Sequence, residues 1–406
     1  MKFLIVGANF KNKGAQSMLF VSVDEIKKRY PEAEVYFASV EQIDEEKYNF
    51  KKLHYAEGAK LLALAEKKRY GKLAIRFLKD IVKFILRQNN SVLHYLDVKK
   101  LFPSLDVMID VSGFNLGMKW DEATHEKYLN NVRLARKYNI PIYLMPQSFG
   151  PFNYPPEREF LKDEMRETLP YVKKIFAREE EGKKLLTEEL GLNNVESSVD
   201  IVLQNPKVNM HNIFKATPKM IIPVIETENN VGIIPNQQCL RHGDKEKILR
   251  LYQGIVSALL REEKEVYLFR HSKEDLSVCN DIKALFNDEE KVHLLENDFS
   301  CFEYDSFIRI FDYIICSRYH GIVHGYKNAI PCIALGWAIK YEELAKNVGQ
   351  EEFVFDITSD SFSVEQVLQT IATMNKNHKA ESEKIKDYVD KIQKVNCFSF
   401  LSEVRK

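Results

Sequence analysis

Short apolar runs, each ending at a glycine or a polar residue and followed by a helical pattern, recur along this chain. The clearest of them are 2–7, 106–111, 140–145, 231–235, 265–269 and 313–316. Parallel strands that are buried on both faces have this continuous apolar character, because helices cover both sides of the sheet. Strands that alternate with helices are typical of an α/β fold with a parallel sheet. The pattern therefore predicts doubly wound, Rossmann-like α/β architecture.

A polar and weakly patterned stretch at 204–220 divides this alternation into two series. A chain of 406 residues is also longer than a single domain usually is. We expect a first Rossmann-like domain over 1–204, with a basic helical insertion at about 58–102, and a second Rossmann-like domain over 205–380. We expect the two domains to face each other across a cleft, and a C-terminal helix within 381–406 to pack back on the first domain.

Charge and hydropathy limit the partners of the chain. Lysine plus arginine and aspartate plus glutamate both total 59, so no overall field attracts nucleic acid. The first apolar run is too short for a signal peptide, and no segment reaches the ~18 uncharged residues of a membrane span. The cysteines form no C-x-x-C pair. We therefore expect a cytoplasmic protein with reduced thiols, no metal site and no nucleic-acid partner.

The insertion at 58–102 carries many cationic residues and few acids. Within it, residues 72–87 mix apolar and cationic side chains at helical spacing, which suits an amphipathic helix on an anionic membrane surface. A helix that packs on its own domain and exposes solvated lysines has the same pattern. We favour the packed surface helix, and keep peripheral contact with the inner face of the cytoplasmic membrane as the alternative.

Candidate site residues follow the carboxyl ends of the predicted strands, where open α/β sheets bind their ligands. Ser317, Arg318 and His320 come directly after the run 313–316, and a helical stretch follows them. A guanidinium and an imidazole at this place suit an anionic substrate, and backbone N–H groups at the helix start add to the attraction. An ordinary loop, in which the arginine and the histidine meet a carboxylate, fits the same residues equally well.

Other strand ends in the second half carry similar groups. Arg270 and His271 follow one predicted strand, and Lys340 lies shortly after another. Several cationic strand ends in one domain predict a cleft wall that binds phosphate or carboxylate, with solvent-exposed arginines as the alternative. His324 would share a helix face with His320, but the glutamate of an H-E-x-x-H zinc site is missing.

The first domain offers weaker candidates. Asn12 and Gly14 lie between the first strand and the first helix, where a glycine permits a tight turn or a close approach of the backbone. The dinucleotide fingerprint G-x-G-x-x-G is absent, so nothing indicates NAD. Asp110 ends a buried strand, where it can serve as a general base or cap the next turn. Gln147 and Ser148 offer hydrogen-bonding groups in a loop rich in proline and glycine.

Four motifs occur in order along the chain: Asn12-Lys13-Gly14-Ala15-Gln16, Met145 to Phe152, Arg178-Glu179-Glu180 and Ser317-Arg318-Tyr319-His320. Together they resemble the polysaccharide pyruvyl transferase family, and the similarity extends from Lys2 to about Phe355. The sequence departs from the commoner pattern of that family at the first motif, where Gly-Ala-Gln replaces Gly-Asp-Glu. The insertion at 58–102 is not part of the common core either.

The resemblance implies a fold like that of the GT-B glycosyltransferases, with the acceptor on the first domain and the donor on the second. It implies that phosphoenolpyruvate is the donor substrate, with no further cofactor. The acceptor would be a sugar of a cell-surface polysaccharide, such as an exopolysaccharide or a capsule, or of its lipid-linked precursor. The product would be a pyruvate ketal that bridges two hydroxyls.

The resemblance also suggests roles for the candidate residues. Arg318 would bind the carboxylate or phosphate of the donor, helped by further cations: Arg178, Arg270 and Lys340. His320 would be the general acid or a phosphate partner, because imidazole titrates near neutral pH. Asp110 would orient or deprotonate the acceptor hydroxyl. The remaining candidates for substrate binding are His271, Ser317, Asn12, Gly14, Gln147 and Ser148.

Two other functions fit the same sequence. The first is a GT-B glycosyltransferase with a nucleotide-sugar donor, which would need an acidic residue on the ribose, and Glu342 or Glu343 can supply it. The second is a surface-polymer binding module without catalysis. In that case replacing Arg318 or His320 by alanine would leave ligand binding intact and would abolish no turnover.

Overall fold

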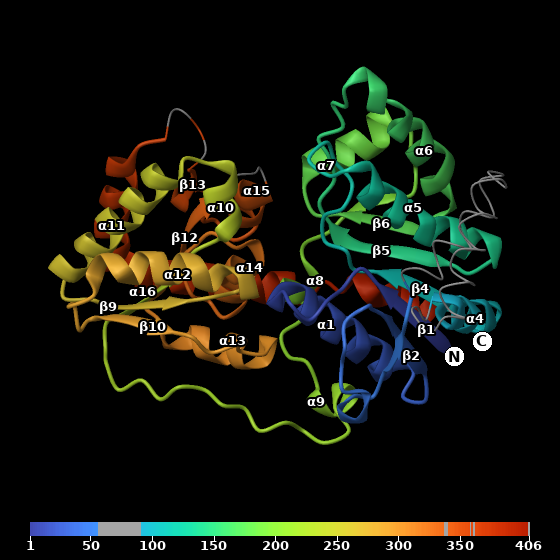
Figure 1. Ribbon diagram of the computed structural model, residues 1–406, viewed down its shortest axis with the longest axis horizontal. Coiled ribbons are helices and arrows are strands. Elements are labelled where there is room, and N and C mark those ends of the chain that lie inside the picture. Colours follow the sequence, from blue (N-terminus) through green and yellow to red (C-terminus); the bar gives the residue numbers. More distant parts are fainter. Residues whose placement is uncertain (56–90, 337–339, 358, 360–361, 405–406) are drawn as a thin grey trace.

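The computed structural model describes residues 1–55, 91–336, 340–357, 359 and 362–404, which form two parallel sheets flanked by helices (Figure 1). The doubly wound α/β architecture predicted from the apolar runs is confirmed. The amphipathic helix expected at 72–87 lies outside the described residues, so membrane contact stays a prediction. Within the described part of the chain, no helix is long and apolar enough to cross a membrane.

The first sheet has seven strands in the order β3-β2-β1-β4-β5-β6-β7, and every neighbouring pair is parallel. Their bounds are β1 Lys2–Val6, β2 Glu34–Ala38, β3 Lys51–Leu53, β4 Val107–Asp110, β5 Ile142–Gln147, β6 Lys174–Ala177 and β7 Val195–Ser197. The helices of this half are α1 Lys13–Arg29, α4 Ser91–Leu101, α5 Glu122–Lys137, α6 Phe160–Thr168 and α7 Glu180–Lys184. The strand order reverses between β1 and β4, which opens a crevice at their carboxyl ends.

The second sheet has six parallel strands in the order β10-β9-β8-β11-β12-β13. They are β8 Asn230–Ile234, β9 Glu265–Phe269, β10 Val292–Leu295, β11 Tyr313–Cys316, β12 Cys332–Gly336 and β13 Val354–Asp356. Its helices are α10 Gln237–His242, α11 Lys245–Arg261, α12 Leu276–Lys283, α13 Cys301–Phe307, α14 Tyr319–Lys327 and α15 Lys340–Lys346. Here the order reverses between β8 and β11, so Ser317 and Arg318 follow a strand at the crevice.

Alternate residues of the central strands enter different cores. Phe3 and Ile5 of β1 belong to one apolar cluster and Leu4 to another, because successive side chains of a strand point to opposite faces. The cluster that holds Phe3 continues into the second domain, where it includes Ile314 and Tyr304. The two domains therefore share an apolar core through α1, α13 and α14, beside the cleft between them.

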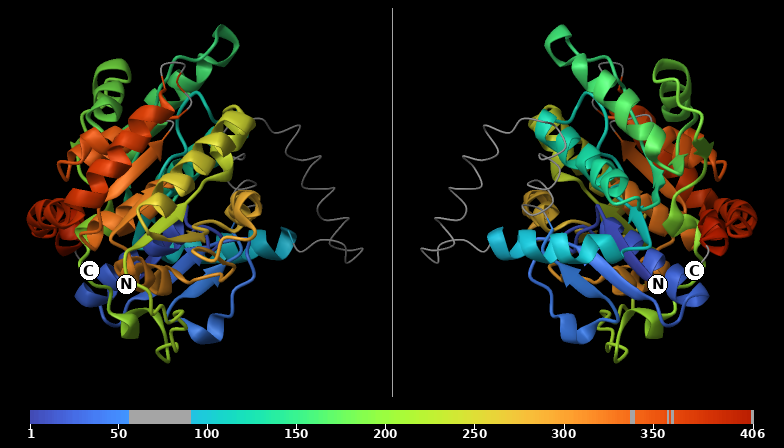
Figure 2. Two further views of the ribbon diagram at one scale, coloured as in Figure 1. Left: turned by 90° about the vertical axis from the view of Figure 1, so that its left-hand side faces the viewer. Right: turned by 90° about the vertical axis from the view of Figure 1, so that its right-hand side faces the viewer.

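The chain passes between the domains twice (Figure 1). After β7, the short helices α8 (Ile201–Gln204) and α9 (Met210–Ile213) lead through an extended stretch to β8. The long helix α16 (Val364–Ile392) leads back, and the 3-10 helix Cys397–Glu403 packs on the first domain. There Phe400 stacks on Tyr143 with ring centroids 3.8 Å apart, and the Tyr30 hydroxyl donates to the carbonyl of Val404 (3.0 Å). Both ends of the chain thus lie side by side on this domain (Figure 2).

Candidate active site

A cavity of about 640 Å³ lies between the two domains, at the carboxyl ends of their strands. Loops that follow β1 and β4 line it from the first domain, and the starts of α10, α14 and α15 line it from the second. Six of the residues selected from the sequence reach its wall: Asn12, Arg178, His271, Arg318, His320 and Lys340. The carboxyl-end crevices of two sheets thus meet in one cavity, which cations enter from both domains.

His320 lies at this domain junction, in the first turn of α14. Its ring packs on the backbone of Gly14 at the start of α1, which leaves no room for a side chain at residue 14. Its Nε2 atom is 3.3 Å from Oδ2 of Asp200. Burial lowers the pKa of His320, and the Asp200 carboxylate acts in the opposite direction. His320 is therefore a mostly buried imidazole whose charge depends on one carboxylate.

Arg178 holds the same carboxylate from the end of β6. Its Nη1 donates to Oδ2 of Asp200, and its Nη2 donates to the carbonyl of Gly113 and to Oγ of Ser148, all at 2.8 Å. The guanidinium also lies 4.3 Å from the ring centroid of Tyr319. Burial acts to lower the pKa of Arg178, but Tyr319, Glu179 and Asp200 outweigh it and raise the pKa. Arg178 is thus a permanent cation whose guanidinium is held in one orientation, in part by Ser148.

Asp200 was not selected from the sequence. It follows β7 and caps α8, accepting a hydrogen bond from the backbone N–H of Val202 at 2.8 Å. Burial acts to raise its pKa, but His320 and Arg178 outweigh this and keep the pKa low, so the carboxylate is ionised. The available signal was its place directly after the last strand of the first domain.

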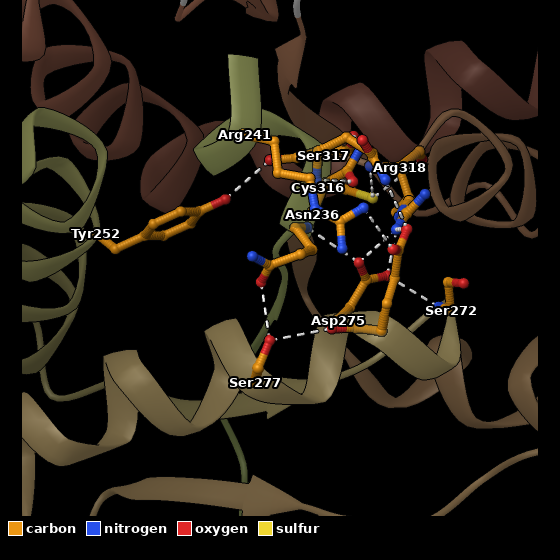
Figure 3. Close-up of polar contacts among 12 residues, drawn as sticks. Asn236, Arg241, Tyr252, Ser272, Asp275, Ser277, Cys316, Ser317 and Arg318 are labelled. Carbon is orange, nitrogen blue, oxygen red and sulfur yellow. Dashed lines mark hydrogen bonds and ion pairs between the residues drawn. The ribbon is translucent and has the colours of Figure 1, made fainter. Parts of the chain in front are cut away.

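Arg318 lines the cavity, yet carboxylates of its own domain hold it (Figure 3). Its Nε donates to Oδ2 of Asp275 (2.8 Å), and its Nη2 donates to Oδ1 of Asp275 (2.5 Å) and to Oε1 of Glu274 (2.8 Å). Asp275 also accepts from the backbone N–H groups of Gln237 and Ser272. These contacts fix the guanidinium at the cavity wall and offset part of its charge.

Ser317 does not line the cavity. Its hydroxyl lies 2.8 Å from that of Tyr252, and the residue is completely buried (Figure 3). Its carbonyl accepts from the Asn236 amide and from the Tyr341 hydroxyl, both at 3.0 Å. The serine thus ties β11 to α11 and to the residues beside the site.

Arg270 and His271 point to different places, although they are neighbours. Arg270 donates to the carbonyl of Asn297 and lies 3.9 Å from Asp298, which pairs more closely with Lys13 of α1 (2.6 Å). His271 is buried at the cavity wall, and neither ring nitrogen has a hydrogen-bond partner among the described residues. Burial, and then the nearby His324, hold the pKa of His271 well below its usual value, so the ring is neutral.

Asp110 and Gln147 are buried and do not form the wall of the cavity. Asp110 is completely buried and accepts from the backbone N–H of Ser112 (2.9 Å) and from the Asn131 amide (3.3 Å). Burial raises its pKa. Gln147 is also buried, and its carbonyl oxygen accepts from the Tyr128 hydroxyl at 3.0 Å. In this arrangement Asp110 caps the turn after β4.

Lys340 enters the cavity at the start of α15. Its Nζ lies 5.2 to 5.7 Å from the ring centroids of Phe114, Tyr341 and Tyr319. Burial lowers the pKa of this ammonium to about 8. Phe114 and Lys340 also line a neighbouring cavity of about 320 Å³, which extends the space toward Phe149 and Gly182.

A further cavity of about 600 Å³ opens along another part of α1, toward α9 and α13. Among the described residues that line it, Asp305 is the one carboxylate, and it lies 2.8 Å from His324, 3.6 Å from Arg309 and 3.7 Å from Lys327. The Nε2 atom of His324 contacts Oγ of Ser17 at 3.0 Å. His324 therefore belongs to helix packing, and the cavity of His320 is the stronger candidate for chemistry.

Comparisons with known proteins agree with this architecture. A family model described as polysaccharide pyruvyl transferase matches residues 12–338, and no curated protein matches the sequence. A Neisseria meningitidis UDP-GlcNAc 2-epimerase bound to UDP-GlcNAc has 13% identity and a TM-score of 0.53, over 95% of this chain and 94% of that one. An S. aureus MnaA–UDP co-structure has 10% identity and a TM-score of 0.55, over 100% and 97%. These likenesses confirm the GT-B-like fold.

Proposed function

Because this chain belongs to the polysaccharide pyruvyl transferase family, we propose that it transfers the pyruvyl group of phosphoenolpyruvate to a surface-polysaccharide sugar, or its lipid-linked precursor, as a ketal. The observation that carries the proposal is the set of three cations and one titratable imidazole around one interdomain cavity: Arg178, Arg318, Lys340 and His320. Phosphoenolpyruvate has a carboxylate and a phosphate, so it needs more than one cationic partner. Guanidinium forks and ammonium groups supply such partners.

The second domain suits the donor. The start of α14 lines the cavity, and the Arg318 side chain does not cap the first backbone N–H groups of this helix, which favour an anion. Asp275 fixes the guanidinium beside them, and Lys340 adds a cation from α15. An anion bound here meets a helix start and two cations on rigid elements.

In the proposed reaction His320 transfers a proton. One acceptor hydroxyl adds to C2 of phosphoenolpyruvate while a proton goes to the terminal methylene carbon, which becomes a methyl group. The C2–O bond to phosphate then breaks, and a second hydroxyl takes its place on C2. The two hydroxyl protons balance the proton gained by carbon and the one that leaves with phosphate. His320 delivers the first proton and recovers one from a hydroxyl, and the cations stabilise the departing phosphate.

The first domain suits a sugar acceptor, because its side of the cavity is aromatic and rich in uncharged amides. Trp120 is 37% exposed and meets the ring of Phe114 edge-on at 5.6 Å. Asn9 and Asn115 lie on the same wall. Aromatic faces contact the C–H face of a sugar ring, and amides bond its hydroxyls. The Trp120 carbonyl accepts from Arg158 at 2.5 Å, which anchors this loop.

A direct assay separates the proposal from its alternative. Phosphoenolpyruvate labelled with carbon-13 at the methylene position, incubated with acceptor oligosaccharide and enzyme, should give a ketal methyl resonance together with inorganic phosphate. Thermal stabilisation by phosphoenolpyruvate should accompany turnover. Stabilisation by nucleotide-sugars alone, with no ketal signal, would indicate a glycosyltransferase instead.

A further inference from the structure

The carboxylate of Asp200 accepts hydrogen bonds from its own domain and also lies close to His320. Its Oδ1 accepts from the backbone N–H of Val202, and its Oδ2 accepts from Nη1 of Arg178, both at 2.8 Å. The Asp200 side chain is 0% exposed. Its Oδ2 lies 3.3 Å from Nε2 of His320, which comes from the other domain. Because a helix start and an arginine hold this carboxylate in place, its position relative to the imidazole is fixed.

The ring of His320 has one buried nitrogen and one that is less covered. Nε2 is buried and directed at Asp200, with an ion-pair separation but without hydrogen-bond alignment. The 14% of the side chain that is exposed therefore lies on its other atoms, and His320 lines the cavity, with Cγ and Nδ1 of the ring beside the backbone of Gly14. Catalytic hydrogen bonds are often long in the absence of substrate and tighten when it binds.

We propose that Asp200 is a positioning residue for His320: its carboxylate keeps a proton on Nε2 and leaves Nδ1 as the nitrogen that meets the substrate. In the neutral ring one nitrogen is a donor and the other an acceptor, and a carboxylate beside Nε2 selects the Nε2–H form. In the charged ring the proton on Nδ1 is then the one delivered to the enol carbon. The inference rests on the proposed function in taking His320 as the proton donor.

The charged and titratable groups that face His320 come from both domains. They are Asp200 and Arg178 from the first, and His324 and His271 from the second. Asp200 is the single anion in this set. Burial, Arg178 and His324 lower the pKa of His320, and Asp200 raises it. Loss of the carboxylate should therefore lower the pKa further, and the acid form of His320 should disappear at a lower pH.

The experiment is an NMR titration of the unliganded protein with nitrogen-15-labelled histidine, in which H320Q assigns the signal of His320. The wild type should show the Nε2–H form. In D200N an amide oxygen that keeps the bond from the Val202 N–H turns the N–H2 group toward both Nε2 and Arg178. We therefore expect a change toward the Nδ1–H form and a midpoint lower by about 1 to 3 pH units. D200E, which retains the charge, should restore the Nε2–H form at least in part.

D305N is the matched control, because Asp305 pairs with His324 one turn further along α14. It should change the signal of His324 and leave the tautomeric form of His320 unchanged. An Nδ1–H form in the wild type, or an identical form and midpoint in wild type and D200N, overturns the inference. The wild-type spectrum decides this even if D200N does not fold.

Turnover supplies a second readout. In D200N the alkaline limb of kcat/KM for phosphoenolpyruvate should move to lower pH, whereas a merely structural role would lower the rate equally at every pH. If the wild type makes no ketal from phosphoenolpyruvate, the proposed function fails. The NMR titration still tests the role of Asp200 in that case, so the two failures are distinguishable.

Discussion

The imidazole of His320 lies on the backbone of Gly14, so closely that a Cβ atom on Gly14 would be 2.1 Å from Cγ of the ring. This contact joins the first and the last of the sequence motifs across the domain boundary. The neighbouring Gln16, where an acid is commoner in the family, accepts from the backbone N–H of Cys301 at 2.8 Å. The start of α1 thus packs on the second domain beside the cavity.

Replacing Gly14 by alanine should displace His320 and strain the domain contact. Overpacking of this kind lowers the free energy of unfolding by about 1–3 kcal/mol. We also expect kcat/KM to fall, by a larger factor than in the G254A control. G254A is the matched control, since a Cβ there meets nothing closer than 3.9 Å and alanine is favoured in a helix. Thermal unfolding and turnover measure both effects. Full activity in G14A would show that His320 can sit elsewhere.

Lys340 should make donor binding depend on pH. Because burial lowers its pKa to about 8, the ammonium is present below that pH and is lost as the pH rises through it. Phosphate is already doubly ionised above its second pKa of ~6, so the donor does not change in this range. We expect the affinity for phosphoenolpyruvate to fall on the order of 10- to 30-fold between pH 7 and 9.5, because the protonated fraction of a group with a pKa of about 8 falls about 30-fold over this range.

Calorimetric titration at several pH values measures this fall. K340R is the informative variant, because a guanidinium stays protonated throughout the range. It should bind the donor with little pH dependence. An equally steep fall in K340R would assign the titration to another group.

Ser317 belongs to a sequence motif of the site but lies in the core, so its substitution tests whether it binds substrate or stabilises the fold. Since its hydroxyl meets that of Tyr252 in the core, S317A should lower the free energy of unfolding by about 1–3 kcal/mol and leave the affinity for phosphoenolpyruvate unchanged. Y252F removes the other partner, and the two losses should be less than additive in the double variant. Weaker donor binding in S317A, at unchanged stability, would contradict this assignment.

Trp120 should contribute to the acceptor and not to the donor. Loss of an aromatic face that stacks on a sugar should raise the KM for the acceptor about 2- to 13-fold in W120A, by analogy with the ~0.5–1.5 kcal/mol of aromatic pairs. The Kd for phosphoenolpyruvate should stay constant. F160A, a change at an exposed aromatic outside the cavity wall, serves as control. A rise in the donor Kd alone would place the donor against the first domain.

The fold was predictable because the central strands are buried on both faces and therefore consist of apolar residues. The region of the site was predictable because open α/β sheets bind ligands at the carboxyl ends of their strands. The directions of individual side chains were harder to predict from the sequence. Arg270 and His271 are adjacent, so their side chains diverge, and only the histidine lines the cavity. The carboxylates that hold Arg318 and His320 lie 43 and 120 positions away in the sequence. Such partners follow from topology and not from local pattern.

The return of the C-terminal segment to the first domain has a consequence for biosynthesis. Phe398, Phe400 and Leu401 belong to the same apolar cluster as Phe3 and Ile5. During translation these residues leave the ribosome only after the whole second domain has been made. N-terminal domains generally fold first as the chain emerges, but this one lacks part of its core until the end. The core of the domain that is begun first is therefore completed only after the second domain has been synthesised.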